Sequence, residues 1–165
     1  MSLTIIILTK NEEKNIEDAI NSAFKCCFNI LVVDSGSTDN TVKLAKNMGA
    51  KVIYRAWDND FSAQRNFALE HVETEWVLYL DADERLSTKL VEAINEAITS
   101  NEDKQYVFKR KSIAFGKEFN YGTLRPDYVP RLFKTTHVQW INKVHEKPIC
   151  NDKPEVLNGY IKHFT

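Results

Sequence analysis

Short apolar runs alternate with amphipathic segments along the first hundred residues of the chain. Four short apolar runs are expected to form strands: residues 3–8, 30–33, 52–54 and 76–80. The first is rich in β-branched residues, as expected of a strand buried on both faces. Apolar residues then recur at helical spacing in the segments between and after the four runs: residues 16–24, 38–48, 61–72 and 88–98. Ser37 or Thr38 is expected to cap the second helix. This alternation predicts an α/β fold with right-handed crossovers and a mostly parallel, Rossmann-like sheet flanked by helices.

The pattern changes after about residue 101. Short runs with aromatic residues follow, separated by polar loops that contain Gly and Pro: residues 106–111, 128–134, 138–140 and 160–163. We interpret these runs as strands of a small mixed β lobe that packs on the same sheet. Residues 1–165 are therefore expected to form one domain with two halves, 1–100 and 101–165.

The fourth apolar run ends abruptly in Asp81-Ala82-Asp83. In an extended chain alternate side chains share one side, so Asp81 and Asp83 are expected together while Ala82 turns away. Carboxylates this close repel each other unless a cation lies between them, and Mg²⁺ or Mn²⁺ suits such a site. An ion held in this way commonly carries a diphosphate, which favours a nucleotide-dependent transferase. A solvated corner between a strand and a loop is the alternative for this motif alone.

The predicted fold brings other polar residues to the same place, because ligands of parallel α/β sheets bind outside the carboxyl ends of the strands. Three of these ends carry Thr9, Asn11, Glu12, Asp34, Asp81 and Asp83. Their convergence on one rim predicts a binding site more strongly than any single motif does. The sequence has no Gly-rich phosphate loop and no G-x-G-x-x-G, which disfavours P-loop and dinucleotide chemistry.

The formal net charge of −1 conceals an asymmetry between the two halves. Residues 1–100 carry 10 Lys and Arg against 16 Asp and Glu, whereas residues 101–165 carry 12 against 7. The acidic half can collect cations, and the basic half can face a phosphorylated or membrane-bound substrate. The three cysteines match neither a zinc site nor a disulfide framework. Because no run has the length of a secretion signal or a membrane span, a cytoplasmic protein is expected, with room for peripheral contact at the inner face of the membrane.

Three segments resemble the motifs of the family 2 glycosyltransferases: residues 9–13 (TKNEE), 32–41 (VVDSGSTDNT) and 80–84 (LDADE). Three later segments resemble the branch that adds sugars to the lipopolysaccharide core, which includes β-1,4-glucosyltransferases: residues 125–128, 130–133 and 144–146. The resemblance implies a GT-A fold, an inverting mechanism, a UDP-sugar donor, a divalent cation (Mn²⁺ or Mg²⁺) and an envelope glycan acceptor. The first half would then bind the nucleotide sugar, and the second would face the acceptor.

The resemblance also assigns donor-binding roles by position. It places Thr9, Asn11 and Glu12 against the donor, and it lets Asp34 accept a hydrogen bond from the uracil imide. The alternatives are turn and first-helix-turn chemistry for Thr9 and Glu12, and bonds to the amides of the next loop for Asp34. Arg65 either neutralises phosphate or pairs with Asp34 inside the fold, and the internal pair is favoured.

The metal ligands follow from the same comparison. Asp81 would reach the ribose or the metal, and Asp83 would bind the metal directly, so that the ion stabilises the departing diphosphate as a Lewis acid. His145 or His163 can supply a neutral imidazole, although a lone histidine is more often structural.

Inversion requires a base that takes the proton of the acceptor hydroxyl. Many members of the family use a Glu-Asp pair, which this sequence lacks in the expected region. Glu146 is preferred to Asp127 because it closes an apolar, strand-like stretch. Trp140 and Tyr121 are candidate sugar platforms, with core packing as the more common use of a residue such as Trp140.

Two other functions remain open at this stage. A nucleotidyltransferase also uses carboxylates and a metal, but it needs a Gly-, Arg- or Lys-rich loop after the first strand, and residues 8–13 are not one. A nucleotide-sugar-binding module without transfer activity is the other, because the chain ends within a predicted strand where the lipopolysaccharide branch continues with helices. The expected partners are a UDP-sugar and a glycan or lipid-linked glycan acceptor, with no nucleic acid; the oligomeric state is left open.

Overall fold

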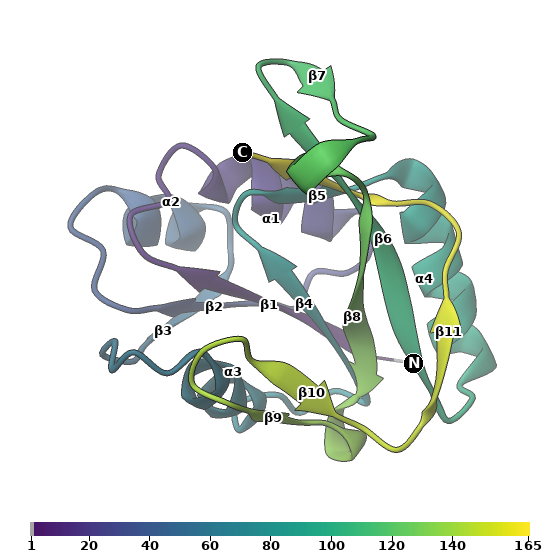
Figure 1. Ribbon diagram of the computed structural model, residues 1–165. Helices are drawn as coiled ribbons and strands as arrows, with labels where there is room; N and C mark the ends of the chain where they lie inside the picture. The colour runs from purple at the N-terminus through teal and green to yellow at the C-terminus, as the bar shows by residue number, and fades with distance from the viewer. Residues whose placement is uncertain (1) are drawn as a thin grey trace.

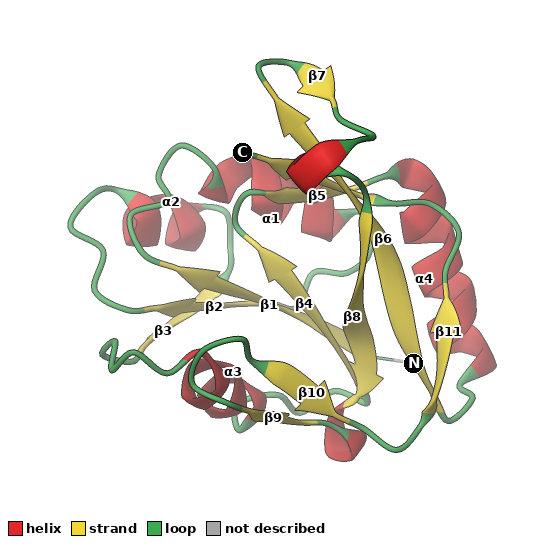
Figure 2. Ribbon diagram, viewed as in Figure 1, coloured by secondary structure: helices red, strands yellow, loops and turns green. Residues whose placement is uncertain are grey.

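The computed structural model describes residues 2–165 and contains one large sheet with helices on both faces (Figures 1 and 2). The helices are α1 (Ile16–Phe24), α2 (Thr41–Asn47), α3 (Phe61–Leu69) and α4 (Thr88–Ser100), with short 3-10 turns η1 (Gly122–Leu124) and η2 (Thr135–His137). The large sheet contains β1 (Leu3–Thr9), β2 (Ile30–Asp34), β3 (Lys51–Tyr54), β4 (Trp76–Asp81), β5 (Glu84–Leu86), β6 (Lys104–Ala114), β7 (Lys117–Glu118), β8 (Asp127–Lys134), β11 (Lys153–Val156) and β12 (Ile161–Phe164). A separate two-stranded ribbon contains β9 (Gln139–Ile141) and β10 (Lys147–Ile149).

The strand order explains how the two halves of the sequence form one sheet. The order is β3-β2-β1-β4-β8-β6-β12-β5, and the first four strands are parallel, as the alternating pattern predicts. Strand β8 then pairs antiparallel with β4, and β6 pairs antiparallel with β8. The strands expected after residue 101 therefore extend the sheet of the first half.

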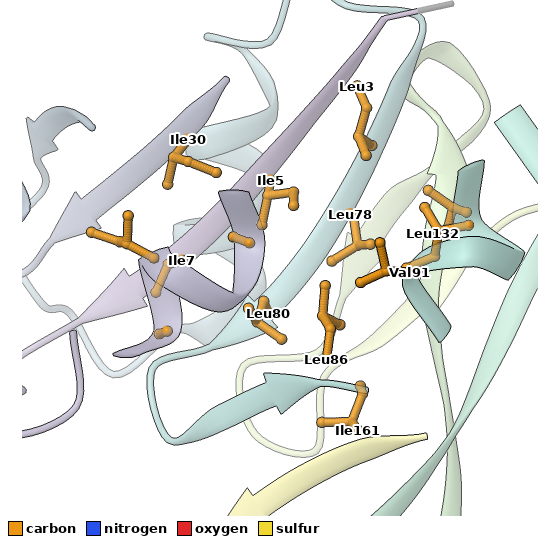
Figure 3. Close-up of a cluster of buried hydrophobic side chains, with 14 of the residues drawn as sticks. Leu3, Ile5, Ile7, Ile30, Leu78, Leu80, Leu86, Val91, Leu132 and Ile161 are labelled. Atoms are coloured by element: carbon orange, nitrogen blue, oxygen red, sulfur yellow. The ribbon is translucent and has the colours of Figure 1, made fainter. Parts of the chain in front are cut away.

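Alternation along β1 sends side chains to two separate cores. Ile5 and Ile7 pack with α1, α2 and α4, whereas Ile6 packs with Ala68 of α3 and with Trp140 of the β9–β10 ribbon. Figure 1 shows α3 and the ribbon below the sheet, with α1 and α2 above it. In the upper core, side chains from β1, β4, β8 and β12 meet those of α4 (Figure 3).

Three local predictions differ from the structure. The second helix begins at Thr41 instead of next to Ser37 or Thr38, because the Asp39 carboxylate accepts the Thr41 N–H at 3.0 Å and forms the turn that starts the helix. The third helix ends at Leu69, three residues early. Four short strands were not predicted, namely β5, β7, β10 and β11. The three residues of β5 pair antiparallel with β12, a contact that no local pattern reveals.

Among residues 2–165, no helix is long and apolar enough to cross a bilayer.

Gly159 provides a test of how the C-terminal strand is joined to the sheet. Its φ is +93°, and an added Cβ would lie 2.3 Å from the backbone nitrogen of Leu90 at the start of α4. We expect Gly159→Ala to lower the free energy of unfolding by about 2–5 kcal/mol, from left-handed strain plus the clash. Gly49 has a similar φ of +91° with nothing within 4 Å of its added Cβ, so Gly49→Ala should cost only about 1–2 kcal/mol. Equal losses in urea denaturation would contradict this packing.

Candidate active site

Two adjoining cavities open at the carboxyl ends of β1, β2 and β4. The first, of about 340 Å³, is lined by Leu8, Thr9, Lys10, Glu12, Ser35, Trp57, Phe61 and Gln64. The second, of about 270 Å³, is lined by Leu8, Glu12, Phe61, Arg65, Asp81, Ala82, Asp83, Glu146 and His163. They share Leu8, Glu12 and Phe61, so together they form one continuous candidate site. Its position is the edge of a parallel sheet where ligands are expected to bind.

A buried charge network fixes the acidic turn between β4 and β5. Glu84 is fully buried, and its Oε2 accepts the backbone N–H of Asp81 at 3.0 Å. Arg131, from β8, approaches Glu84 Oε1 to 2.9 Å and Asp81 Oδ2 to 3.4 Å. The same guanidinium donates to the carbonyl of Tyr79 at 3.2 Å. One buried arginine therefore fixes the last residue of β4 relative to the turn that follows it.

This network sets the charges at the rim. Burial alone would raise the pKa of Asp81, but the positive charges of Arg131 and Arg65 outweigh it and lower that pKa to about 2. Burial raises the pKa of Glu84 although Arg131 acts against it, and the two facing carboxylates raise the pKa of Arg131. Asp81 is therefore a carboxylate at neutral pH, with guanidinium groups on two sides.

Asp83 and His163 meet at the second cavity. His163 Nε2, on β12, lies 3.1 Å from Asp83 Oδ2, and this bond raises the pKa of the imidazole. Both side chains are partly exposed, at 23% for His163 and 36% for Asp83. His145 was also a candidate metal ligand, but it is exposed in the loop after β9 and lines neither cavity. Within residues 2–165, no three His, Cys, Asp or Glu side chains come together closely enough to hold a metal ion.

Arg65 lies between the two acidic sides of the second cavity. Its Nη2 is 3.2 Å from Glu146 Oε1 and 3.6 Å from Asp81 Oδ1. The guanidinium also lies over the Trp140 ring at 4.7 Å and the Tyr79 ring at 5.5 Å. The favoured pair of Arg65 with Asp34 is therefore wrong: the arginine faces the cavity and pairs with acids there.

The Asp34 carboxylate is instead used within the loop after β2. It is 3% exposed, and it accepts hydrogen bonds from the Thr9 hydroxyl at 2.9 Å and from the amides of Gly36 and Ser37 at 3.0 and 2.8 Å. The Ser37 hydroxyl donates a fourth bond. In the structure Asp34 therefore bonds the amides of the next loop, which was the alternative to a contact with the uracil imide.

Asn11 and Glu12 join the first strand end to that loop. Asn11 has a φ of +55°, and its side-chain oxygen accepts the Thr38 N–H at 2.8 Å. The Glu12 N–H donates to the Thr41 hydroxyl at 2.8 Å, which leaves the Glu12 side chain at the wall of both cavities. Both residues therefore form hydrogen bonds within the turn, as the alternative to donor binding predicted for Glu12. Of the two, Glu12 also lines the candidate site.

The two candidate bases occupy different places. Glu146 lines the second cavity and is tied to α3, since the Lys143 carbonyl in its loop accepts the Phe61 N–H at 3.2 Å. Asp127 lies outside both linings and forms a two-pronged pair with Arg110, at 3.0 and 2.6 Å. Of the two candidates, Glu146 alone lines the candidate site.

The aromatic candidates also separate. Trp140 is 6% exposed and packs edge-to-face against Tyr79, with ring centroids 4.9 Å apart, so core packing is its role in this structure. Tyr121 is 87% exposed and lies in the segment before η1, away from both linings. Trp57 and Gln64, which line the first cavity, were not predicted, because neither lies at a strand end.

Comparison with known proteins agrees with this fold. S. aureus TarS, crystallised with UDP-GlcNAc, superposes over 100% of this chain and 59% of that structure, with a TM-score of 0.68 and 18% sequence identity. A mycobacterial glucosyl-3-phosphoglycerate synthase, crystallised with Mn²⁺ and UDP-glucose, matches over 70% of this chain with a TM-score of 0.54 and 23% identity. These likenesses define the class of fold, the Rossmann-like GT-A type.

Sequence comparison gives the family. The profile described as Glycosyl transferase family 2 matches residues 4–151. An uncharacterised glycosyltransferase of Rickettsia typhi is 41% identical over 99% of this chain and 60% of its own length. The lipopolysaccharide core biosynthesis glycosyltransferase LpsC of Rhizobium meliloti is 32% identical over 62% of this chain and 39% of its own length. The chain belongs to glycosyl transferase family 2, and it spans 60% or less of the length of these relatives.

The buried network is open to a direct stability test. Glu84→Gln keeps the side-chain shape but removes the charge that faces Arg131, so we expect a loss of about 3–5 kcal/mol in the free energy of unfolding. Asp103→Asn is the matched control, because its pair with Lys134 is at the surface and its side chain is 70% exposed; we expect little change. Chemical denaturation of both variants measures the difference. Similar denaturation midpoints for the two variants would show that the network does not stabilise the fold.

Proposed function

We propose that this chain is the donor-binding domain of an inverting glycosyltransferase that moves a sugar from a UDP-sugar to an envelope glycan such as lipopolysaccharide core. The observation that carries the proposal is the meeting of Asp81, Asp83, His163, Arg65 and Glu146 at one cavity. Membership of the family supports the reaction class, and the similarity to LpsC, a lipopolysaccharide core biosynthesis glycosyltransferase, supports the acceptor class. The UDP and UDP-GlcNAc complexes of TarS support uridine as the nucleoside.

The first cavity suits a nucleobase and its ribose. Trp57 and Phe61 form an apolar wall, with ring centroids 4.6 Å apart, while Thr9 and Gln64 offer hydrogen-bonding groups. Asp34 does not line this cavity, and each of its carboxylate oxygens accepts two hydrogen bonds within its own loop, so a contact to the uracil imide would require that loop to rearrange. Because the Asp34 carboxylate also holds the loop after β2, Asp34→Asn would change that loop as well as any contact to the uracil. This variant therefore does not test uracil recognition alone.

The residues at the second cavity fit a divalent cation. Asp83, in the turn after β4, presents an oxygen and His163, on β12, presents a nitrogen, while Asp81 adds a second carboxylate. A cation of the Mg²⁺ or Mn²⁺ type commonly takes one or two protein carboxylates together with substrate phosphates. When bound there, it would stabilise charge on the departing nucleoside diphosphate as a Lewis acid. Arg65 would add a fixed positive charge, because the two aromatic rings beneath it hold its guanidinium in place.

Glu146 is the proposed base. Its carboxylate would accept the proton of the acceptor hydroxyl as that oxygen attacks the anomeric carbon. Arg65 orients Glu146, since one guanidinium contacts its Oε1 through both Nε and Nη2, at 3.4 and 3.2 Å. The loop that carries Glu146 is bonded to the first turn of α3, which anchors the proposed base beside that helix.

Metal dependence tests the donor site. We expect UDP to bind on the order of tenfold or more weakly in EDTA than in Mn²⁺, because the rim carboxylates then repel the diphosphate. Asp83→Ala should remove most of this difference and leave the fold intact, since its side chain is partly exposed. Asp103→Ala is the control and should bind as the unaltered chain does. Isothermal calorimetry that gives equal affinities with and without Mn²⁺ would reject the cation site.

The base is tested by a pair of matched amides. Glu146→Gln should retain UDP-sugar affinity, because the amide oxygen can still accept from Arg65, while transfer falls by roughly 10²–10⁴-fold. Asp127→Asn should behave nearly as the unaltered chain. Transfer to a glycan acceptor and donor affinity are measured separately. The reverse pattern would assign the base to Asp127, and UDP binding without any transfer or donor hydrolysis in the unaltered chain would favour a binding module.

A further inference from the structure

We propose that the β6–β7 hairpin docks the domain on an anionic membrane surface through Phe115 and the basic side chains around it. This inference rests on the proposed function, because docking on a membrane would serve an enzyme whose glycan acceptor is carried on a lipid. Figure 1 shows this hairpin projecting from the body of the molecule.

Phe115 occupies the first position of a tight turn, where asparagine is the favoured residue. Ile113 pairs with Glu118 and Ala114 with Lys117, which leaves Phe115 and Gly116 as a two-residue turn. Both have positive φ, +52° and +72°, as in the type I′ turn, where Asn-Gly is the favoured sequence. A bulky side chain in this region is a genuine outlier. The local backbone therefore does not explain the choice of phenylalanine.

The ring of Phe115 is also outside any core. It is 97% exposed, more than any other large hydrophobic residue in the part of the chain that the structure describes. Tyr121 and Tyr128, which follow the hairpin, are 87% and 58% exposed. Exposed aromatic rings at a protruding tip are typical of a surface that becomes buried against a partner.

The charge around the tip identifies the partner. Residues 109–128 carry five Lys and Arg against two Asp and Glu, in a chain whose net charge is −1. Arg110 and Lys111 are paired with the two acids, Asp127 and Glu118. Lys117 and Arg125 are exposed and form no ion pair in the described residues. Basic side chains around an inserted aromatic ring match the headgroups and the outer acyl region of an anionic bilayer. The tip is convex, so it can enter an interface but cannot enclose a sugar.

The hairpin is also placed to bring the site to that surface. Strand β6 runs parallel to β12, and Ser112 and Ile113, just before the hairpin, pair with His163 and Phe164. The hairpin therefore projects from the same edge of the sheet that carries the candidate metal ligands. A domain docked through Phe115 would present this edge to acceptors held in the membrane.

Vesicle co-sedimentation tests the proposal. The unaltered chain should bind vesicles of phosphatidylcholine mixed with phosphatidylglycerol, and bind those of phosphatidylcholine alone far less. Phe115→Asn should lower the partition coefficient roughly tenfold, with no loss of thermal stability because asparagine suits the turn. Lys117→Gln should lower it roughly fivefold, and added salt should weaken binding further. Phe28→Asn is the control, since Phe28 is 81% exposed at the opposite edge of the sheet, before β2.

Three results would overturn the proposal. The first is equal binding to the two kinds of vesicle, and the second is an equal loss for the Phe28 and Phe115 variants. The third is a dimer that Phe115→Asn dissociates, which would make the hairpin a contact between two copies. UDP calorimetry on the same samples keeps this test separate from the proposed function: Phe115→Asn should bind UDP normally, and a chain that binds vesicles but not UDP would reject only the enzyme assignment.

Discussion

Arg131 carries the charge on which the geometry of the candidate site depends. It enters from β8, an antiparallel strand of the second half of the sequence, and contacts Glu84, Asp81 and the Tyr79 carbonyl of the first half. Glu84 and Arg131 are buried together, and removing either one would leave an uncompensated buried charge. The acidic turn that offers Asp83 to the cavity is thus secured by residues distant in sequence.

The parallel half of the fold could be predicted from sequence because its signals are local. Buried strands such as β1 and β4 are short apolar runs, and the first and fourth helices show apolar faces at helical spacing. Strand β5 could not be predicted, since its three residues become a strand only by pairing with β12. The start of the second helix was misplaced, because the Asp39 side chain, and not Ser37 or Thr38, bonds the Thr41 amide at that end.

The candidate site divides in the same way. Residues at strand ends, such as Asp81 and Asp83, were predictable because a parallel sheet gathers them at one edge. The pairing partners of these residues were not predictable. Arg65 pairs with Glu146, 81 positions away, and not with Asp34. Side-chain pairing depends on how the β9–β10 ribbon packs against α3, which no periodicity encodes. The same packing places Glu146 at the second cavity, so the second half of the sequence completes a cavity begun by the first half.

A crystal structure of the chain with UDP and Mn²⁺ would test the central claim most directly, namely that the adjoining cavities form one donor site. We expect the uracil between Trp57 and the strand end at Thr9, with the diphosphate beside Arg65. We expect the ion on Asp83, with His163 turned toward it. A nucleotide bound away from these two cavities, or an ion with no ligand from Asp81, Asp83 or His163, would contradict the account.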